Sequence, residues 1–164
     1  MKRVLLVSGI YPPDVGGPAT FISRFASHLV KTGKVVKVIT LAENSHQHDP
    51  FQSFPITRIP RNMPRVLRQL VTISKISKEL KSVDVVLCNG LYLETSIALK
   101  LTKRKIRSVA KVVGDPVWER QRNQEKTNAS TIEEFATGNQ GLLSRLQRYV
   151  HTASLQEFSS ITVP

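Results

Sequence analysis

The sequence predicts an open, mostly parallel α/β sheet with helices on both of its faces. Short runs rich in β-branched residues alternate along the chain with amphipathic helical patterns. These runs are apolar at both odd and even positions, which is typical of parallel strands buried on both faces. The predicted order is β-α-β-(β)-α-β-α-β-α-β, and right-handed crossovers then place the helices on the two sides of one sheet.

The first three elements are a strand, a helix and a strand. Residues 4–9 (VLLVSG) and 35–41 (VVKVITL) are predicted to be buried strands. The helix between them should end before Gly33, and Pro18 is expected at its first position, where a missing N–H costs nothing. The inward face of this helix is predicted to carry Phe21, Ile22, Phe25 and Leu29.

The middle of the chain continues the same alternation. Residues 56–59 predict a weaker strand, and residues 65–81 predict a helix. The apolar residues expected to face inward on this helix are Val66, Leu67, Leu70, Ile73, Ile76 and Leu80. Residues 83–90 and 108–115 predict two more buried strands, separated by a helix at about 93–103.

The C-terminal part predicts a final helix and a short strand, SSITVP. The apolar residues of this amphipathic helix are Leu142, Leu146, Tyr149, Val150 and Ala153. The chain stops at Pro164 directly after the strand, where an α/β protein would normally continue. We therefore expect these residues to be part of a larger protein.

The composition is that of a globular protein with a large positive charge for its size. The 164 residues are 40% hydrophobic, enough for one domain or half of a two-domain protein. No run has the length of a membrane span and no signal segment opens the chain, so a cytoplasmic location is expected. The single Cys88 excludes an internal disulfide. The net charge of +12 leaves phosphorylated ligands, anionic membrane surface and nucleic acid open.

A ligand site is expected where the strands end. In open α/β sheets, ligands bind beyond the carboxyl ends of the strands, at the point where the winding direction reverses. The first strand leads into YPPDVGGPA, the fourth into residues 89–92 and the fifth into residues 114–116. If the order reverses between the first and fourth strands, all three loops line one cleft.

Gly16 and Gly17 are the leading candidates in this cleft. Two glycines before a helix expose backbone N–H groups at the positive end of the helix dipole, which favours an anion such as phosphate. That the pair only permits a tight turn is an equally good interpretation. Neither G-x-G-x-x-G after the first strand nor G-x-x-x-x-G-K-[ST] is present, which excludes NAD-dependent dehydrogenases and P-loop NTPases.

The segment KRVLLVSGIYPPDVGGPATFISRFASHLVKTGKVVKVIT resembles the N-terminal half of retaining GT-B glycosyltransferases of the large family 4. That group carries a Y-P-P-x-x-G-G loop after its first strand and T-G-H-x-V before its second. VDVVLCNG, AKVVGDPVWER and SSITVP follow in the expected order, so the resemblance spans essentially the whole chain. It implies a Rossmann-like three-layer α/β/α fold, with residues 1–164 as the N-terminal, acceptor-binding domain. The C-terminal nucleotide-sugar-binding domain would be absent from this chain.

The resemblance also implies an activity and roles for three residues. The protein would be a hexosyltransferase that moves a sugar from a nucleotide-sugar to a glycan or lipid-linked acceptor, without metal or cofactor, and this chain alone would be inactive. The amides of Gly16 and Gly17 would face the donor diphosphate. Asp115 stands where many relatives place a histidine near the reacting sugar, and it would be catalytic, an orienting group or a strand-end cap.

Acceptor binding is expected from residues in the three loops. These residues are Tyr11, Asn89, Trp118, Glu119 and Arg120. Each has a plainer interpretation: Tyr11 would pack beneath its loop, Asn89 would cap the next helix, and the residues from Trp118 on would form a solvated loop.

The excess positive charge is clustered. The basic residues that fall at helical spacing, opposite the predicted inward face, are Arg61, Arg65, Arg68 and Lys75. They would form either a patch for an anionic membrane surface, with the protein at the inner face of the membrane, or a solvated helix face. Nucleic acid is not expected, because no basic–aromatic interleaving accompanies the charge. His46, His48 and Asp49 lack the further ligands that a structural metal site needs.

Three functions therefore remain open from the sequence. The first is the acceptor-binding half of a retaining glycosyltransferase. The second is a non-catalytic basic module that binds anionic glycan, membrane surface or nucleic acid. The third is a free-standing flavodoxin-like domain whose glycine loop holds a phosphorylated small ligand. A coding sequence that continued past Pro164 into a second α/β domain with paired glutamates would favour the first.

Overall fold

The computed structural model describes residues 1–43, 53–113 and 142–163. Their helices and strands, in chain order, are β1 (Arg3–Ser8), α1 (Gly17–Lys31), β2 (Val35–Ala42), β3 (Ile56–Pro60), α2 (Arg65–Leu80), β4 (Val85–Asn89), α3 (Tyr92–Leu101), β5 (Arg107–Lys111), α6 (Leu142–Leu155) and β6 (Ser160–Thr162). The strands form one parallel sheet in the order β3-β2-β1-β4-β5-β6. The predicted fold class is therefore confirmed.

The winding direction of the sheet reverses between β1 and β4. From β1 the chain moves outward through β2 to β3, returns across the sheet to β4, and then moves outward again to β6. The last residue of β1, Ser8, pairs with Thr40 of β2 and with Asn89 of β4. The expected reversal is confirmed, and the loops that follow β1 and β4 start side by side.

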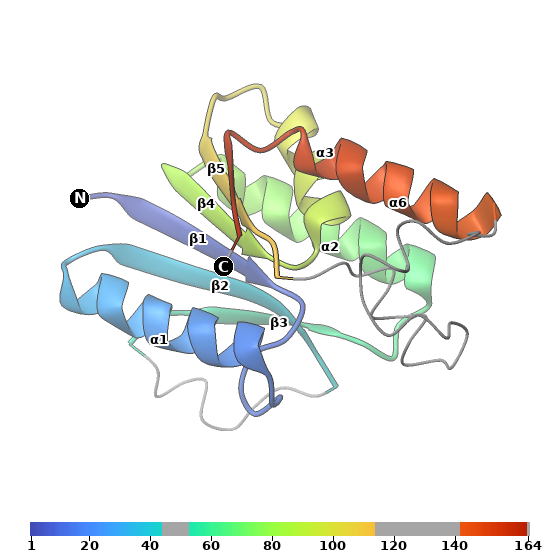
Figure 1. Ribbon diagram of the computed structural model, residues 1–164. Helices are drawn as coiled ribbons and strands as arrows, with labels where there is room; N and C mark the ends of the chain where they lie inside the picture. Colours follow the sequence, from blue (N-terminus) through green and yellow to red (C-terminus); the bar gives the residue numbers. More distant parts are fainter. Residues whose placement is uncertain (44–52, 114–141, 164) are drawn as a thin grey trace.

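Both faces of the sheet are buried against helices, as the apolar runs predict. Leu5 and Val7 of β1 belong to the core under α2, α3 and α6, whereas Val4 and Leu6 belong to the core under α1. Each such side chain contributes about 1.5–3 kcal/mol of transfer free energy. In the part of the chain that the structure describes, α1 covers one face, and α2, α3 and α6 cover the other (Figure 1).

The buried side of α2 differs from the prediction. Val66, Leu67 and Leu70 were expected to face inward, but they are 69%, 48% and 60% exposed. The helix is buried further along, at Ile76 and Leu80. Over the first half of α2, the side that faces the other helices borders an open groove and is not packed against a neighbouring element. A helical period identifies an apolar stripe, but it does not say whether another element covers that stripe.

Two further details of the helices differ from the prediction. α1 begins at Gly17 with Gly16 as its N-cap, so Pro18 is the second helical residue and not the first. On α6, Leu146 and Tyr149 are exposed, because α6 packs on α3 through another side that includes the buried Ser154.

Candidate functional site

The loop that follows β1 is fastened to the end of β3 by Arg61. The guanidinium of Arg61 forms an ion pair with Asp14 in the loop. It also donates hydrogen bonds to the carbonyl oxygens of Gly9 (3.1 Å) and Leu41 (3.3 Å), at the ends of β1 and β2. The loop is thus held in one shape over the carboxyl edge of the sheet, which fixes where α1 begins.

The Asp14–Arg61 pair predicts a pH-dependent stability. The pKa of the Asp14 carboxyl is lowered from 3.8, chiefly because Arg61 donates a hydrogen bond to it. A depressed folded-state pKa stabilises the fold above the unfolded pKa, and this contribution is lost as the pH falls through the folded-state pKa. We expect Asp14→Asn to lower the free energy of unfolding by about 1–2 kcal/mol at pH 7 and by progressively less below the unfolded pKa. Urea denaturation across this pH range measures the effect, and a loss that did not change with pH would contradict it.

Tyr11 lies beneath the same loop. Its side chain is 3% exposed and belongs to the core under α1. The guanidinium of Arg58 lies 5.5 Å from the centroid of the Tyr11 ring and donates a hydrogen bond to the carbonyl oxygen of Pro12 (2.6 Å). This placement agrees with the packing interpretation of Tyr11, and the predicted acceptor contact would need the loop to move.

The two glycines at the start of α1 have different surroundings. Gly16 has φ +155°, and a Cβ built on it would lie 2.9 Å from Cδ1 of Ile10, so this position requires glycine for the turn. A Cβ built on Gly17 would meet no atom within 4 Å. The N-terminus of α1 has no side-chain cap and no acidic residue in its first turn, so its free N–H groups remain available to an external anion.

Lys111 adds a positive charge beside α1, and the sequence did not predict this position. Its Nζ lies 4.8 Å from the centroid of the Phe21 ring, one helical turn after Gly17. Phe21 in turn stacks on Phe25, with ring centroids 5.5 Å apart. Because Lys111 is the last residue of β5, the carboxyl ends of β1 and β5 both contribute to this side of the sheet.

Asn89 ends β4 next to the loop of β1. It is 4% exposed, and within the described residues its Nδ2 has no hydrogen-bond partner. Its backbone carbonyl oxygen accepts a hydrogen bond from Ser8 Oγ (3.3 Å). A buried amide donor without a partner costs free energy, so a ligand that reached it would gain that hydrogen bond. The helix after β4 has Leu91 as its N-cap, with no side-chain cap hydrogen bond, so Asn89 does not cap it.

The ends of β1 and β4 approach each other closely at two glycines. Gly90 has φ +110°, and a Cβ built on it would lie 2.9 Å from the backbone nitrogen of Gly9. Nothing lies within 4 Å of a Cβ built on Gly9. Gly90 therefore allows the two loops at the reversal point to touch through their backbones.

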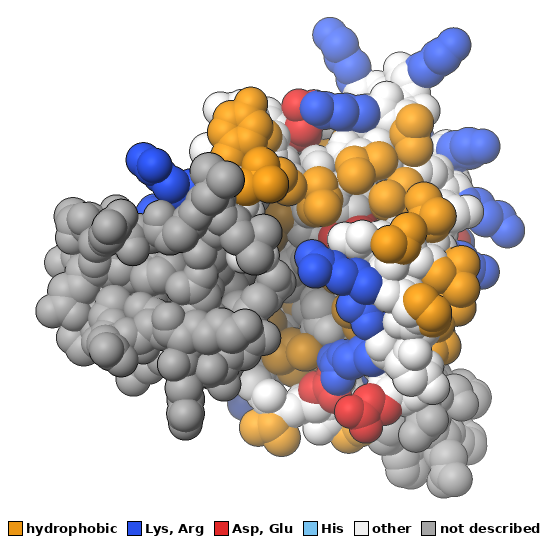
Figure 2. Space-filling model, turned by 90° about the vertical axis from the view of Figure 1, so that its right-hand side faces the viewer, with side chains coloured by type: hydrophobic (Ala, Val, Ile, Leu, Met, Phe, Trp, Pro, Cys, Tyr) orange, Lys and Arg blue, Asp and Glu red, His pale blue; other side chains and the backbone are white. Residues whose placement is uncertain are grey.

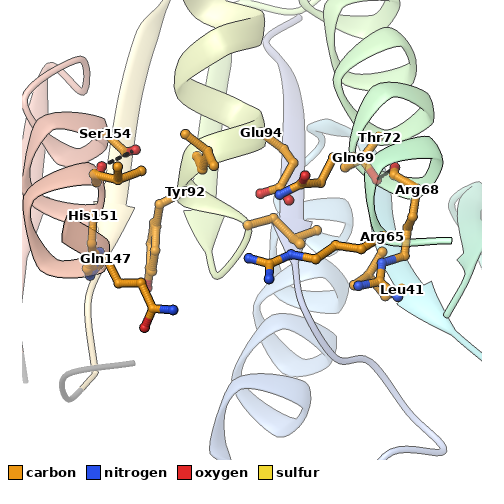
Figure 3. A pocket seen from close by; sticks show the side chains of 13 residues that line it. Leu41, Arg65, Arg68, Gln69, Thr72, Tyr92, Glu94, Gln147, His151 and Ser154 are labelled. Carbon is orange, nitrogen blue, oxygen red and sulfur yellow. Dashed lines mark hydrogen bonds between the residues drawn. The ribbon is translucent and has the colours of Figure 1, made fainter. Parts of the chain in front are cut away.

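A groove of about 450 Å³ opens on the other side of this reversal point, between α2 and α6 and over the start of α3 (Figure 3). It is lined by Leu41, Arg65, Arg68, Gln69, Thr72, Leu91, Tyr92, Leu93, Glu94, Gln147, Val150, His151 and Ser154. From the sequence, Arg65 and Arg68 were assigned to a surface patch, and Leu91 and Tyr92 to the cleft loop that follows the fourth strand. The contribution of α6 to a site was not predicted. The volume is in the range typical of small-molecule sites.

The polar side chains of the groove come from three helices. Figure 3 shows Arg65 of α2 reaching over the groove, with Gln147 and His151 of α6 on the opposite side and Tyr92 of α3 between them. The Tyr92 hydroxyl donates a hydrogen bond to the carbonyl oxygen of Lys111 (2.6 Å), and the rings of Tyr92 and His151 have centroids 5.4 Å apart. The groove can therefore offer charged, amide and aromatic contacts to one ligand.

The predicted basic patch is only partly a surface feature. Arg65 and Lys75 are exposed. Arg61 precedes α2, and its guanidinium is engaged by Asp14. Arg68 is half-buried, and its Nη1 donates a hydrogen bond to the carbonyl oxygen of Arg61 (2.6 Å). Helical spacing could not reveal these contacts, because their partners lie in a loop and at a strand end.

Several predicted residues lie outside the described residues. They are Asp115, Trp118, Glu119, Arg120, His46, His48 and Asp49. Among the residues in the described ranges, no three His, Cys, Asp or Glu side chains form a group that could hold a metal ion.

Burial raises the pKa of the Cys88 thiol to about 12, so this thiol is not a nucleophile at neutral pH.

No described helix combines the length and the apolar character needed to cross a bilayer.

The fold resembles that of solved glycosyltransferases. Sucrose-phosphate synthase from Thermosynechococcus elongatus aligns over 98% of this chain and 42% of its own, with a TM-score of 0.61 and 14% identity. An alpha-glucosyltransferase solved with UDP and a 13-mer DNA aligns over 99% of this chain and 37% of its own, with a TM-score of 0.56 and 14% identity. MurG from Acinetobacter baumannii aligns over 74% of this chain and 39% of its own, with a TM-score of 0.51 and 17% identity.

At these identities the likeness shows the fold alone. The chain has the Rossmann-like fold found in GT-B glycosyltransferases, and it spans less than half the length of each of these proteins. No protein-family model and no curated protein sequence matches it.

Proposed function

We propose that this chain is the acceptor-binding half of a retaining GT-B glycosyltransferase of family 4, which moves a sugar from a nucleotide-sugar to a glycan or lipid-linked acceptor. The observation that carries the proposal is the reversal point between β1 and β4. The uncapped start of α1 lies on one side of it and the polar groove lies on the other. The fold likeness to glycosyltransferases over 98% and 99% of the chain supports it.

The two sides of the reversal point suit the two substrates. Negative charge grows on the donor diphosphate as its bond to the sugar breaks, and fixed N–H groups stabilise such developing charge. We assign this role to Gly17 and the other free N–H groups at the start of α1, and the positive charge of Lys111 nearby supports the assignment. The groove would hold the acceptor so that its hydroxyl bonds to the sugar carbon on the face from which the diphosphate leaves, as retention of configuration requires. We assign Asp115 to the reacting sugar and expect the nucleotide to bind a further domain.

Transfer is tested with the polypeptide encoded by the complete reading frame. Labelled nucleotide-sugars are supplied with soluble and lipid-linked acceptors, and the anomeric configuration of the product is determined by NMR. We expect a product with the configuration of the donor, no dependence on added metal, and no turnover by residues 1–164 alone. An inverted product would contradict the retaining assignment, and no product with any donor would contradict the activity.

The outer side of α2 supports peripheral contact with an anionic membrane, as a second part of the proposal. Exposed apolar residues stand beside exposed lysines there, namely Val66, Leu67, Leu70, Lys75 and Lys78. Figure 2 shows the molecule from the side to which the strands point, where apolar side chains lie next to Lys and Arg side chains. Apolar burial at the headgroups and attraction to anionic lipid would act together here.

Vesicle binding tests this contact. We expect the chain to sediment with vesicles that contain phosphatidylserine, and to be released as salt is raised. Lys75→Glu/Lys78→Glu should weaken binding by about 30-fold or more, since each basic residue near the surface contributes about 1 kcal/mol. The matched control, Lys103→Glu/Lys105→Glu, makes the same charge change on exposed residues after α3. Equal weakening by both pairs, or no binding at low salt, would remove the α2 assignment.

A further inference from the structure

We infer that the groove between α2 and α6 selects an acidic saccharide, that is, a sugar bearing a phosphoryl or carboxylate group. The role of that saccharide as acceptor rests on the proposed function, whereas its binding does not. The inference starts from the polar side chains that converge on the groove, and from the balance of charge among them.

The uncharged polar groups of the groove suit the hydroxyls of a sugar. Gln69 on α2 and Gln147 on α6 can each donate and accept hydrogen bonds. The hydroxyls of Thr72 and Ser154 donate to the carbonyl oxygens of Arg68 and Val150 (both 2.7 Å), so toward a ligand they act as acceptors. Glu94 of α3 accepts hydrogen bonds, and Figure 3 shows its carboxylate next to the Gln69 amide. Such a set can bind neighbouring hydroxyls as donors and acceptors at once.

The charge of the groove favours an anionic substituent on that sugar. Arg65 is exposed and, in the described part of the chain, forms no ion pair. Arg68 is held in place by its hydrogen bond to the Arg61 carbonyl oxygen (2.6 Å). Among the described residues that line the groove, Glu94 is the one acid and stands against two guanidiniums, so their combined charge is positive. A guanidinium binds a carboxylate or phosphate through two parallel hydrogen bonds, which gives orientation as well as affinity.

The start of α3 adds to this positive side. Leu91, Tyr92 and Leu93 line the groove, so the first turn of α3 faces it. The N-cap Leu91 is in the left-handed conformation (φ 55°) and makes no side-chain cap hydrogen bond. The free N–H groups of this turn favour negative charge, which Glu94 in the same turn supplies in part, so the two arginines remain the main attraction for an anion in the groove.

Binding is tested on the 164-residue chain by isothermal titration at 150 mM salt. The ligands are glucose, glucose 6-phosphate, glucuronate and inorganic phosphate. We expect at least one acidic sugar to bind ten or more times more tightly than both glucose and inorganic phosphate, and comparison of the two acidic sugars distinguishes the phosphoryl from the carboxylate source. Equal affinity for glucose and both acidic sugars would overturn the inference, and so would inorganic phosphate binding as tightly as the sugars.

Two variants and a matched control locate the site. Arg65→Gln should lower the affinity for the acidic sugar about tenfold and leave the affinity for glucose unchanged. Glu94→Gln should weaken glucose binding, since it removes an acceptor for hydroxyls, and should raise the preference for the acidic sugar over glucose, since it also removes a negative charge from the groove. Arg24→Gln makes the same change as Arg65→Gln on an exposed residue of α1, on the opposite face of the sheet, and should change nothing. Unaltered binding by Arg65→Gln, or equal weakening by Arg24→Gln, would overturn the assignment to the groove. Circular dichroism confirms that each variant is folded.

The binding experiment can contradict the groove assignment without contradicting the proposed function, and the transfer assay can do the reverse. Acidic-sugar binding without any transfer would contradict the proposed function and leave the groove assignment intact. Transfer by the complete polypeptide to neutral acceptors only, with no effect of Arg65→Gln, would overturn the groove assignment and leave the proposed function intact.

Discussion

Gly17→Val in the polypeptide encoded by the complete reading frame is expected to lower kcat/KM for sugar transfer by about 100-fold, or about 2.7 kcal/mol of transition-state stabilisation. A Cβ at Gly17 meets no atom within 4 Å, so the folded chain has room for the new side chain. The space that the side chain fills is the approach to the free N–H groups at the start of α1. Steady-state kinetics gives the loss, and the thermal unfolding midpoint should stay unchanged.

Two neighbouring changes serve as controls for Gly17→Val. Thr20→Val alters an exposed residue one turn along the same helix and should leave transfer within about twofold of the parent. Gly16→Ala should lower stability, because Gly16 has φ +155° and its Cβ would lie 2.9 Å from Ile10. A Gly17→Val enzyme with unchanged kcat/KM would mean that the start of α1 does not bind the diphosphate.

Gly90→Ala is expected to lower the free energy of unfolding by about 3 kcal/mol. Gly90 has φ +110°, which strains any other residue, and its Cβ would lie 2.9 Å from the backbone nitrogen of Gly9. A backbone atom cannot rotate aside as a side chain can, so the ends of β1 and β4 must separate. Urea denaturation of the 164-residue chain measures the loss.

Gly9→Ala provides the matched control for Gly90→Ala. It adds the same methyl group on the other side of the same contact, but that Cβ would have nothing within 4 Å. We expect a change within about 0.5 kcal/mol. Similar losses from the two substitutions would show that the close approach of the two loops is not what requires glycine at residue 90.

The fold could be predicted because its determinants are local in the sequence. Strands such as β1 and β2 are apolar on both faces, and that pattern predicts a parallel sheet wherever they lie. The buried side of α2 could not be predicted in the same way. Val66, Leu67 and Leu70 form a regular apolar stripe, yet they are exposed, since no described element covers that side of the helix.

The candidate site, like the fold, could be predicted only in part. Gly16 and Gly17 lie in one short motif, so the start of α1 could be found from the sequence. The groove is built by Arg65, Tyr92 and His151, which come from three helices far apart in the chain. None of the three stands out in the sequence of its own helix, and only the packing of α2, α3 and α6 brings them together. Arg61 was misread as a helix-face residue for a similar reason, because its partner Asp14 precedes it by 47 residues.

The long reach of Arg61 has a consequence for how the protein folds. Its contacts with Asp14 and Gly9 close chain segments of 47 and 52 residues, and contacts of such sequence separation form late, because the entropy of loop closure must be overcome first. The glycine turn should therefore acquire its final shape only after β3 has docked onto the growing sheet. A ligand bound to that turn would then slow the unfolding of this whole half of the domain. Slower amide hydrogen exchange in β2 and β3 would show that the ligand has bound.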